Sequence, residues 1–224
     1  MIVIAIANSK GGVGKTTLTT ALAVRAAQDS KRVCMVDLDP QCSLSEWWAR
    51  RGKRDNPTCF VGVDSAIEAV ERAEMDGWDW CFLDGPPAFL ETVKEMIEAA
   101  DLSVIPVKSG LVDLLATQDA VALARDAGAA FLCVFNDVEP PRAGGKPDRL
   151  AEKARSYLFS SDVPIADAQI AHRVSHVDGM NLGKSAAETK DKIAAAEIDA
   201  LWLEVKEKAK ASAKKRAKKA AGNV

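Results

Sequence analysis

Short apolar runs alternate along this chain with longer segments in which apolar residues recur every three or four positions. The short runs predict strands, and the periodic segments predict amphipathic helices. Because each strand-like run is continuously apolar rather than alternating, helices should cover both faces of the sheet. The predicted strands are residues 2–8, 32–37, 79–84, 102–107 and 130–136, and the predicted helices lie near residues 15–29, 65–75, 89–99 and 114–126.

This alternation predicts an α/β fold, a doubly wound and mostly parallel sheet flanked by helices. The chain has 224 residues, of which 48% are hydrophobic, so it can form one domain with a sizeable core. We place that domain at residues 1–205. A stretch rich in Pro and Gly at 139–148 predicts a surface loop, which should lead into a helix near 149–159 and a short strand near 163–166.

The last part of the chain is predicted to be a long helix that ends in a basic tail. A helical pattern runs on from Ser185, and its bulky apolar residues stop at Val205, so we expect the helix to leave the body there. Residues 206–219 carry eight Lys or Arg against one acid, Glu207, although the net charge of the whole chain is only −2. We treat residues 206–224 as a separate basic tail, rich in Lys and Ala.

Composition argues against secreted and membrane-spanning classes of protein. The five cysteines form no C-x-x-C pair, and three of them lie in strand-like apolar runs, so we interpret them as reduced core residues. The start of the chain lacks the basic region of a signal peptide, and no apolar run is long enough to span a membrane. We therefore expect a cytoplasmic protein.

A glycine-rich loop, SKGGVGKTT at residues 9–17, follows the first predicted strand and precedes the first predicted helix. In this context glycines let backbone N–H groups and the helix N-terminus bind phosphate oxygens. Lys15 should neutralise the β- and γ-phosphates, and Thr16 should ligate Mg²⁺. The nucleotide-contacting residues that we predict are Gly11, Gly12, Val13, Gly14, Lys15, Thr16 and Thr17.

Ser9 stands where the motif G-x-x-x-x-G-K-[ST] has its first glycine, and Lys10 follows it. With this lysine the loop resembles the deviant Walker A box, K-G-G-x-G-K-T, of the ParA/MinD family of ATPases. The resemblance implies MgATP as the cofactor and a homodimer that sandwiches the nucleotide. It also implies that Lys10 reaches the nucleotide of the partner subunit as part of the catalytic set, with Lys15 and Asp39.

Acidic residues end the next two predicted strands, where ligand groups converge in open α/β sheets. The segment VDLDPQ at 36–41 resembles the family's D-x-D-P-Q box, and WCFLDGPP at 80–87 resembles its Walker B strand. The resemblance implies that Asp39 positions or activates the attacking water, and that Asp37 and Asp84 hold waters on Mg²⁺. Asn136, at the end of a later strand, corresponds to the family's adenine-side residue. The segment VIPVKS at 104–109 also resembles a family motif, although Gly110 stands near where we expect proline.

The chain most resembles the short ParA proteins that segregate plasmids and carry no domain for reading DNA sequence. Such proteins bind DNA nonspecifically when they are loaded with ATP, through basic residues near the carboxyl end of the domain. Lysines on an Ala-rich helix suit phosphate contact without base readout. A solvated tail that only aids solubility is the alternative interpretation. The candidate DNA-binding residues are Arg173, Lys184, Lys214, Lys215, Arg216, Lys218 and Lys219.

The leading hypothesis is therefore a nucleoid-associated, ParA-type ATPase whose slow hydrolysis is stimulated by a ParB-like or other cargo-bound partner. A plasmid is the first cargo we consider, beside a chromosome region, a chemoreceptor cluster or a carboxysome. One alternative is a MinD-like membrane-associated positioning ATPase, but the Ala-rich tail lacks the large apolar residues of a membrane anchor. A second alternative is an accessory ATPase of a conjugation system that assembles on DNA. The metal-carrier branch of the family is disfavoured because no C-x-x-C pair is present.

Two pairs of side chains receive no firm role from the sequence. Trp47 and Trp48 follow the segment VDLDPQ at 36–41. They could either cover the hydrophobic core or contact a partner subunit. His172 and His176 suit one helix face, but no third metal ligand lies nearby in the sequence, so we assign them no metal.

Overall fold

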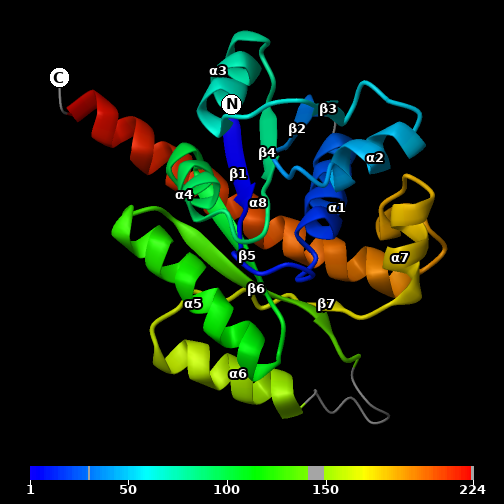
Figure 1. The fold of residues 1–224 in the computed structure, drawn as a ribbon, viewed down its shortest axis with the longest axis vertical. Helices are drawn as coiled ribbons and strands as arrows, with labels where there is room; N and C mark the ends of the chain where they lie inside the picture. Colours follow the sequence, from blue (N-terminus) through cyan, green and yellow to red (C-terminus); the bar gives the residue numbers. More distant parts are fainter. Residues whose placement is uncertain (30, 141–148, 223–224) are drawn as a thin grey trace.

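The computed structural model describes residues 1–29, 31–140 and 149–222, and a parallel sheet lies at its centre. Within these residues the sheet has seven strands in the order β3-β2-β4-β1-β5-β6-β7, and all neighbouring strands are parallel (Figure 1). This confirms the predicted α/β fold. The strands are β1 (Ile2–Ile6), β2 (Val33–Asp37), β3 (Thr58–Phe60), β4 (Trp80–Asp84), β5 (Leu102–Val107), β6 (Phe131–Val138) and β7 (Ile170–Ala171).

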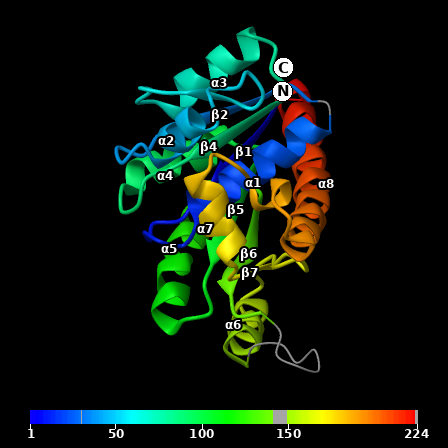
Figure 2. The ribbon, with the colours of Figure 1, turned by 90° about the vertical axis from the view of Figure 1, so that its right-hand side faces the viewer.

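Helices cover both faces of the sheet, as continuously apolar strands require. α1 and α8 pack on one face, and α3, α4 and α5 pack on the other (Figure 2). The helices are α1 (Lys15–Gln28), α2 (Ser43–Arg50), α3 (Ala66–Met75), α4 (Leu90–Ala99), α5 (Leu111–Asp126), α6 (Arg149–Ser160), α7 (Val174–Asn181) and α8 (Lys192–Gly222), with a short 3₁₀ helix, η1 (Ala186–Glu188), before α8.

Trp202 fixes α8 to the sheet. Its ring is fully buried and meets the ring of Trp80 edge-on, with a centroid separation of 4.9 Å. Its Nε1 donates to Asp29 Oδ2 at 3.0 Å, and Lys206 Nζ binds the same oxygen at 2.6 Å. A buried aromatic ring whose polar atom has a partner stabilises packing strongly. The end of α1 and the middle of α8 are therefore held together.

The structure differs from the sequence prediction in the second half of the chain. Residues 163–166 do not form a strand, because only Ile165 makes a single bridge, to Cys133, and Pro164 has no N–H to extend the ladder. The last strand of the sheet is β7 instead. α2, β3 and α7 are short elements that the hydrophobic pattern did not predict. Of the predicted loop at 139–148, residues 141–148 lie outside the described residues.

The chain does not leave the body at Val205, as the end of its bulky apolar residues had suggested. α8 is one unbroken helix across the expected boundary between residues 205 and 206, and Ala209 is still fully buried. Further on, the guanidinium of Arg216 donates to the carbonyls of Ala99 and Ala100 at 2.9 and 3.2 Å. Small Ala side chains let the helix stay close to the body where bulky ones are missing. No helix among the described residues is both long and apolar enough to cross a membrane.

Candidate active site

The carboxyl ends of β2, β4 and β1 bring the predicted site together. These three strands are neighbours in the sheet, and Asp37 at the end of β2 is in register with Asp84 at the end of β4. β1 ends beside Asp84 and continues into the glycine loop. Segments far apart in the sequence therefore converge at the edge of the sheet where ligands bind in open α/β folds.

The glycine loop adopts a backbone that most residues avoid. Gly12 and Gly14 have φ angles of 71° and 85°, in the left-handed region that favours glycine. The buried Lys15 folds back over the loop, and its Nζ donates to the carbonyl of Lys10 at 3.0 Å. Burial lowers the pKa of Lys15, although the carboxylates of Asp84 and Asp39 oppose this shift. A loop of this shape presents a lysine and backbone amides to one anion.

Asp84 and Thr16 form the centre of the candidate magnesium site. Thr16 Oγ1 donates to Asp84 Oδ2 at 2.7 Å, and Thr19 Oγ1 donates to Oδ1 at 3.0 Å. Asp84 is only 1% exposed. Burial raises the pKa of Asp84 to about 7, although the hydrogen bond from Thr16 lowers it. The carboxylate is thus held in place before any cation binds.

These oxygens fit Mg²⁺, which prefers hard oxygen ligands and usually keeps several waters. In the part of the chain that the structure describes, no group of three or more His, Cys, Asp or Glu side chains could hold a metal ion by itself. The ion would therefore need oxygens from Thr16, from a nucleotide and from water. Asp37 and Asp84 lie side by side at the ends of β2 and β4, and their expected role of holding waters on Mg²⁺ stays a prediction.

The loop after β2 carries the predicted catalytic acid. Asp37 is 5% exposed, and its Oδ2 accepts bonds from Ser45 N at 2.7 Å and Ser45 Oγ at 2.6 Å. Asp39 is only half-buried, and its Oδ1 accepts from Gln41 N at 3.0 Å. One acid is thus locked to the start of α2, while the other keeps partial access to solvent. A water-positioning carboxylate needs such access.

Lys10 has a partner within its own chain. Its Nζ is bonded to Asp113 Oδ1 in the first turn of α5. A Cβ on Gly110 would lie 2.6 Å from Asp113 Oδ2, so a side chain at position 110 would press on this carboxylate. The glycine at the place where the sequence departs from the family motif therefore makes room for Asp113.

A pocket of about 360 Å³ opens beside the glycine loop, between β6 and α7. Asn136 lies at its edge, and its Nδ2 donates to the carbonyl of Val13 at 2.7 Å. The contact is so close that a Cβ on Gly14 would lie 2.2 Å from Asn136 Nδ2. Gly12, Gly14, Thr17 and Asn136, all predicted nucleotide contacts, line this pocket together.

Other residues of the pocket were missed from the sequence. Asp137 accepts bonds from Lys108 Nζ and His172 Nδ1, both at 2.6 Å. Partial burial alone would raise the pKa of Asp137, but the bonds from Lys108 and His172 outweigh it and hold the pKa below its usual value. His176 also lines the pocket, and its two ring nitrogens are buried without a partner among the described residues. The sequence signals were weak: Asp137 directly follows Asn136, and the pair His172 and His176 received no role.

The glycine loop and its acids lie inside a segment that matches a known family of proteins. Residues 4–206 match the family described as "CobQ/CobB/MinD/ParA nucleotide binding domain". This chain belongs to that family. It is 33% identical over 217 residues to the maintenance of carboxysome distribution protein A of Gloeobacter kilaueensis, covering 89% of this chain and 95% of that protein. It is 32% identical over 153 residues to the chromosome-partitioning ATPase Soj of Thermus thermophilus, covering 53% of this chain and 61% of that protein.

Solved structures agree with this assignment at the level of the fold. The apo structure of McdA from Cyanothece has a TM-score of 0.75 to this chain, over 93% of this chain and 99% of that one, at 18% identity. Members of the ParA/MinD family are ATPases that bind ATP with Mg²⁺. The family and the cofactor that the glycine loop predicted are therefore confirmed.

The predicted DNA-binding residues of this ParA/MinD-family chain do not form one surface. Arg173 pairs with Glu197 at 2.6 Å and lines the pocket beside the glycine loop, so it lies apart from the tail. Lys184 is exposed on the loop before η1. Arg216 binds backbone carbonyls at the end of α4, where a cation suits the helix dipole. The exposed tail lysines that remain together on α8 are Lys214, Lys215, Lys218 and Lys219.

Proposed function

We propose that this chain is a nucleotide-gated positioning ATPase. ATP closes a homodimer, the closed dimer binds DNA nonspecifically, and hydrolysis stimulated by a cargo-bound partner releases it. The family supports the ATPase part of this cycle. The observation that carries the DNA-binding part is the lysine-covered outer side of α8.

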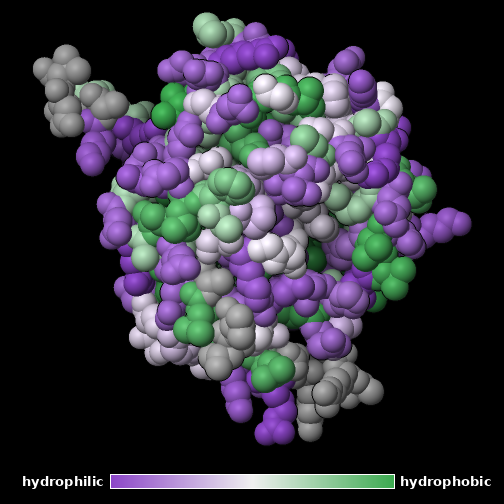
Figure 3. Space-filling model, viewed as in Figure 1, coloured by the Kyte–Doolittle hydropathy of each residue, from purple (hydrophilic) through white to green (hydrophobic). Residues whose placement is uncertain are grey.

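The side of α8 that faces solvent is basic along its last turns. Ala209 and Arg216 lie two helical turns apart, so they share the side that contacts the body. Lys210, Lys214 and Lys218 follow one another at about one turn, and they lie roughly 100° to 180° around the helix from Ala209. In Figure 3 the coloured part of this end of α8, next to the body, is mostly hydrophilic. Lysines at this spacing suit contact with successive phosphates.

Dimer closure is supported by apolar side chains around Lys10. Phe89, Leu90 and Leu115 are 58%, 48% and 54% exposed. The first two follow Ala88, whose N–H donates to the carbonyl of Ser9 at 2.8 Å, and Leu115 lies on the helix that carries Asp113. Exposed apolar side chains beside a functional lysine are typical of a protein interface. The partner that we propose for this surface is a second copy of the chain.

Within the dimer, Lys15 and the amides of the glycine loop hold the phosphates, and Asp39 orients the attacking water. Lys10 completes the partner subunit's site, so hydrolysis depends on closure. Mg²⁺, when bound through Thr16 and the waters on Asp37 and Asp84, supplies positive charge to the phosphates. Asn136 and the pocket beside it receive the nucleoside.

The cargo that we propose is a large assembly rather than a small molecule. The relative from Gloeobacter kilaueensis, similar over nearly its whole length, is a carboxysome-distribution protein. This similarity supports a carboxysome-like cargo over the plasmid that the sequence first suggested. In either case the partner is a cargo-bound protein that stimulates hydrolysis.

Substitution of the α8 lysines tests the DNA interface. The variant Lys210→Gln, Lys214→Gln, Lys218→Gln should lose most ATP-dependent DNA binding while its ATP affinity is unchanged. The matched control removes three exposed lysines outside α8, Lys53→Gln with Lys94→Gln and Lys153→Gln, and should bind DNA like the wild type. Equal DNA affinity in the α8 variant and the wild type would refute the proposed interface.

A further inference from the structure

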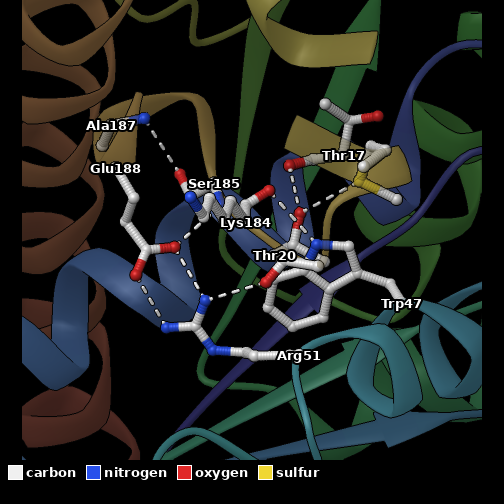
Figure 4. Close-up of polar contacts among 10 residues, drawn as sticks. Thr17, Thr20, Trp47, Arg51, Lys184, Ser185, Ala187 and Glu188 are labelled. Carbon is white, nitrogen blue, oxygen red and sulfur yellow. Dashed lines mark hydrogen bonds and ion pairs between the residues drawn. The ribbon is translucent and has the colours of Figure 1, made fainter. Parts of the chain in front are cut away.

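The far end of α2 is fastened to the loop before α8 by a buried ion pair. Arg51 Nη1 and Nη2 bind the two carboxylate oxygens of Glu188 at 2.7 and 2.9 Å (Figure 4). The Arg51 side chain is only 6% exposed. Burial opposes ionisation, but the hydrogen bonds from Arg51 and from Ser185 N hold the pKa of Glu188 below its usual value. A fork of this kind fixes orientation as well as distance.

The backbones meet directly beside this ion pair. Gly183 has a φ of 63°, and a Cβ on it would lie 2.3 Å from Arg51 N. Arg51 Nη1 also donates to the carbonyl of Gly183 at 3.0 Å, and the buried Trp47 donates from Nε1 to the carbonyl of Lys184 at 3.2 Å (Figure 4). The contact has no room for slippage of one segment along the other.

The N-terminal end of α2 is hydrogen-bonded to the acidic loop, residues 37–42, which joins β2 to α2. Ser45, in the first turn of α2, donates two hydrogen bonds to Asp37. Asp39 and Gln41 lie on the short segment between β2 and α2. A displacement of α2 must therefore move the backbone that carries Asp39.

The loop on the other side is continuous with the wall of the nucleotide pocket. Lys184 N donates to the carbonyl of Gly179 in α7 at 2.9 Å, and a Cβ on Gly179 would lie 2.8 Å from the carbonyl of Lys184. Met180 of α7 lines the pocket and contacts Thr20 of α1, with 3.5 Å between Sδ and Oγ1. Residues 183–188 thus join α7 to the end of α2.

We propose that α2 is a strut, closed by the Arg51–Glu188 ion pair, that holds the Asp39 loop in register with the nucleoside pocket. Arg51 is a positioning residue for the hydrolysis proposed above, since it acts on Asp39 through α2 and not on the substrate. A buried ion pair often adds little net stability compared with apolar packing, so orientation is the better account of its presence here. This inference rests on the proposed ATPase activity.

The test compares Arg51→Lys with a matched control on the same helix. Arg51→Lys keeps the charge and loses the fork, whereas Arg50→Lys changes an exposed arginine whose partner is Glu46, at 3.0 Å. In Arg51→Lys, single-turnover ATP hydrolysis should slow by at least about tenfold, with ATP affinity changed less than about threefold. The control should match the wild type in both quantities. Hydrolysis by folded Arg51→Lys at the wild-type rate would overturn the strut.

A second measurement does not depend on activity or on one variant. Hydrogen exchange of the amides in residues 37–45 should be faster by at least about fivefold in Glu188→Gln and Arg51→Lys than in Arg50→Lys, because the acidic loop loses its support. Unchanged exchange in that segment would overturn the strut, even if the ion pair stabilises the domain. A wild-type chain that hydrolyses no ATP would instead overturn the proposed function, and the exchange result would still decide on the strut.

Discussion

Lys10 Nζ is bonded to the carboxylate of Asp113, which lies 103 positions further along the chain. The lysine that family resemblance assigns to a partner subunit's nucleotide is therefore engaged within its own subunit. The two side chains are 32% and 18% exposed, so water screens the pair only partly. In the proposed dimer Lys10 enters the partner subunit's site, so closure would break this bond and Asp113 would oppose closure.

Asp113→Asn should favour the dimer. The carboxylate charge that holds Lys10 is removed with little change of volume, so the ATP concentration for half-maximal dimerisation should fall by about 1.4- to 5-fold, in line with the roughly 0.2–1 kcal/mol of a partly exposed ion pair. Sedimentation at increasing ATP measures this. Asp119→Asn, an exposed acid on the same helix, is the control and should change nothing. A higher ATP requirement in Asp113→Asn would contradict this account.

Gly110→Ala should lower the ATP concentration for half-maximal dimerisation, as Asp113→Asn does. The added Cβ would lie 2.6 Å from Asp113 Oδ2 and should push the carboxylate away from Lys10. The double variant should then dimerise like either single variant, because both changes remove one interaction. Additive effects of the two substitutions, measured by the same sedimentation series, would mean that Gly110 acts by another route.

Substitution of Lys15 should abolish nucleotide binding, whereas substitution of Asp39 should stop only hydrolysis. Lys15→Ala removes the cation from the phosphate loop and should abolish nucleotide binding in a calorimetric titration. Asp39→Ala should leave binding intact and trap the dimer, because we propose that this half-buried carboxylate serves the attacking water rather than the nucleotide. Rapid hydrolysis by Asp39→Ala would refute the role assigned to this residue.

Asp29→Asn should destabilise the domain in a pH-dependent way. Bonds from Lys206 and Trp202 hold the pKa of Asp29 well below its usual value. An acid with a depressed pKa contributes stability above its unfolded-state pKa, and this contribution is lost as pH falls towards the folded-state pKa. At neutral pH the variant should lose about 1–2 kcal/mol, or roughly 2–8 °C in Tm. The difference from the wild type should shrink below about pH 4.

Asp76→Asn is the matched control for thermal unfolding, because Asp76 is exposed and lies 3.9 Å from its partner Arg72. Its Tm should stay close to that of the wild type at every pH. A deficit in Asp29→Asn that persists undiminished in acid would show that its carboxylate charge is not the cause.

The central sheet and the glycine loop were predictable because their signals are local. The central strands are almost entirely apolar runs, and the residues from Lys10 to Thr17 form one contiguous motif. The acids Asp37 and Asp84 each end such a run, so parallel strand order alone brings them together. Local patterns therefore yielded the fold and the phosphate side of the site.

The remaining features depend on contacts between distant residues. α2 begins after Cys42, whose φ of 55° and lack of a side-chain cap give no start signal. Arg51 meets Glu188 from 137 positions away, and no periodicity marks that pairing. The course of α8 beyond Val205 was also mispredicted, because Ala209 packs as well as a larger residue where the helix lies close to the sheet.

The most direct test of nucleotide-gated DNA binding is the affinity of the purified chain for nonspecific duplex DNA with ATP, with ADP and without nucleotide, each across a salt series. Binding should require ATP and weaken steeply with salt, with a slope of log K against log salt of about −5 if six phosphates are neutralised. Binding of equal strength in all three nucleotide states, or no binding by a chain that still dimerises with ATP, would contradict the account.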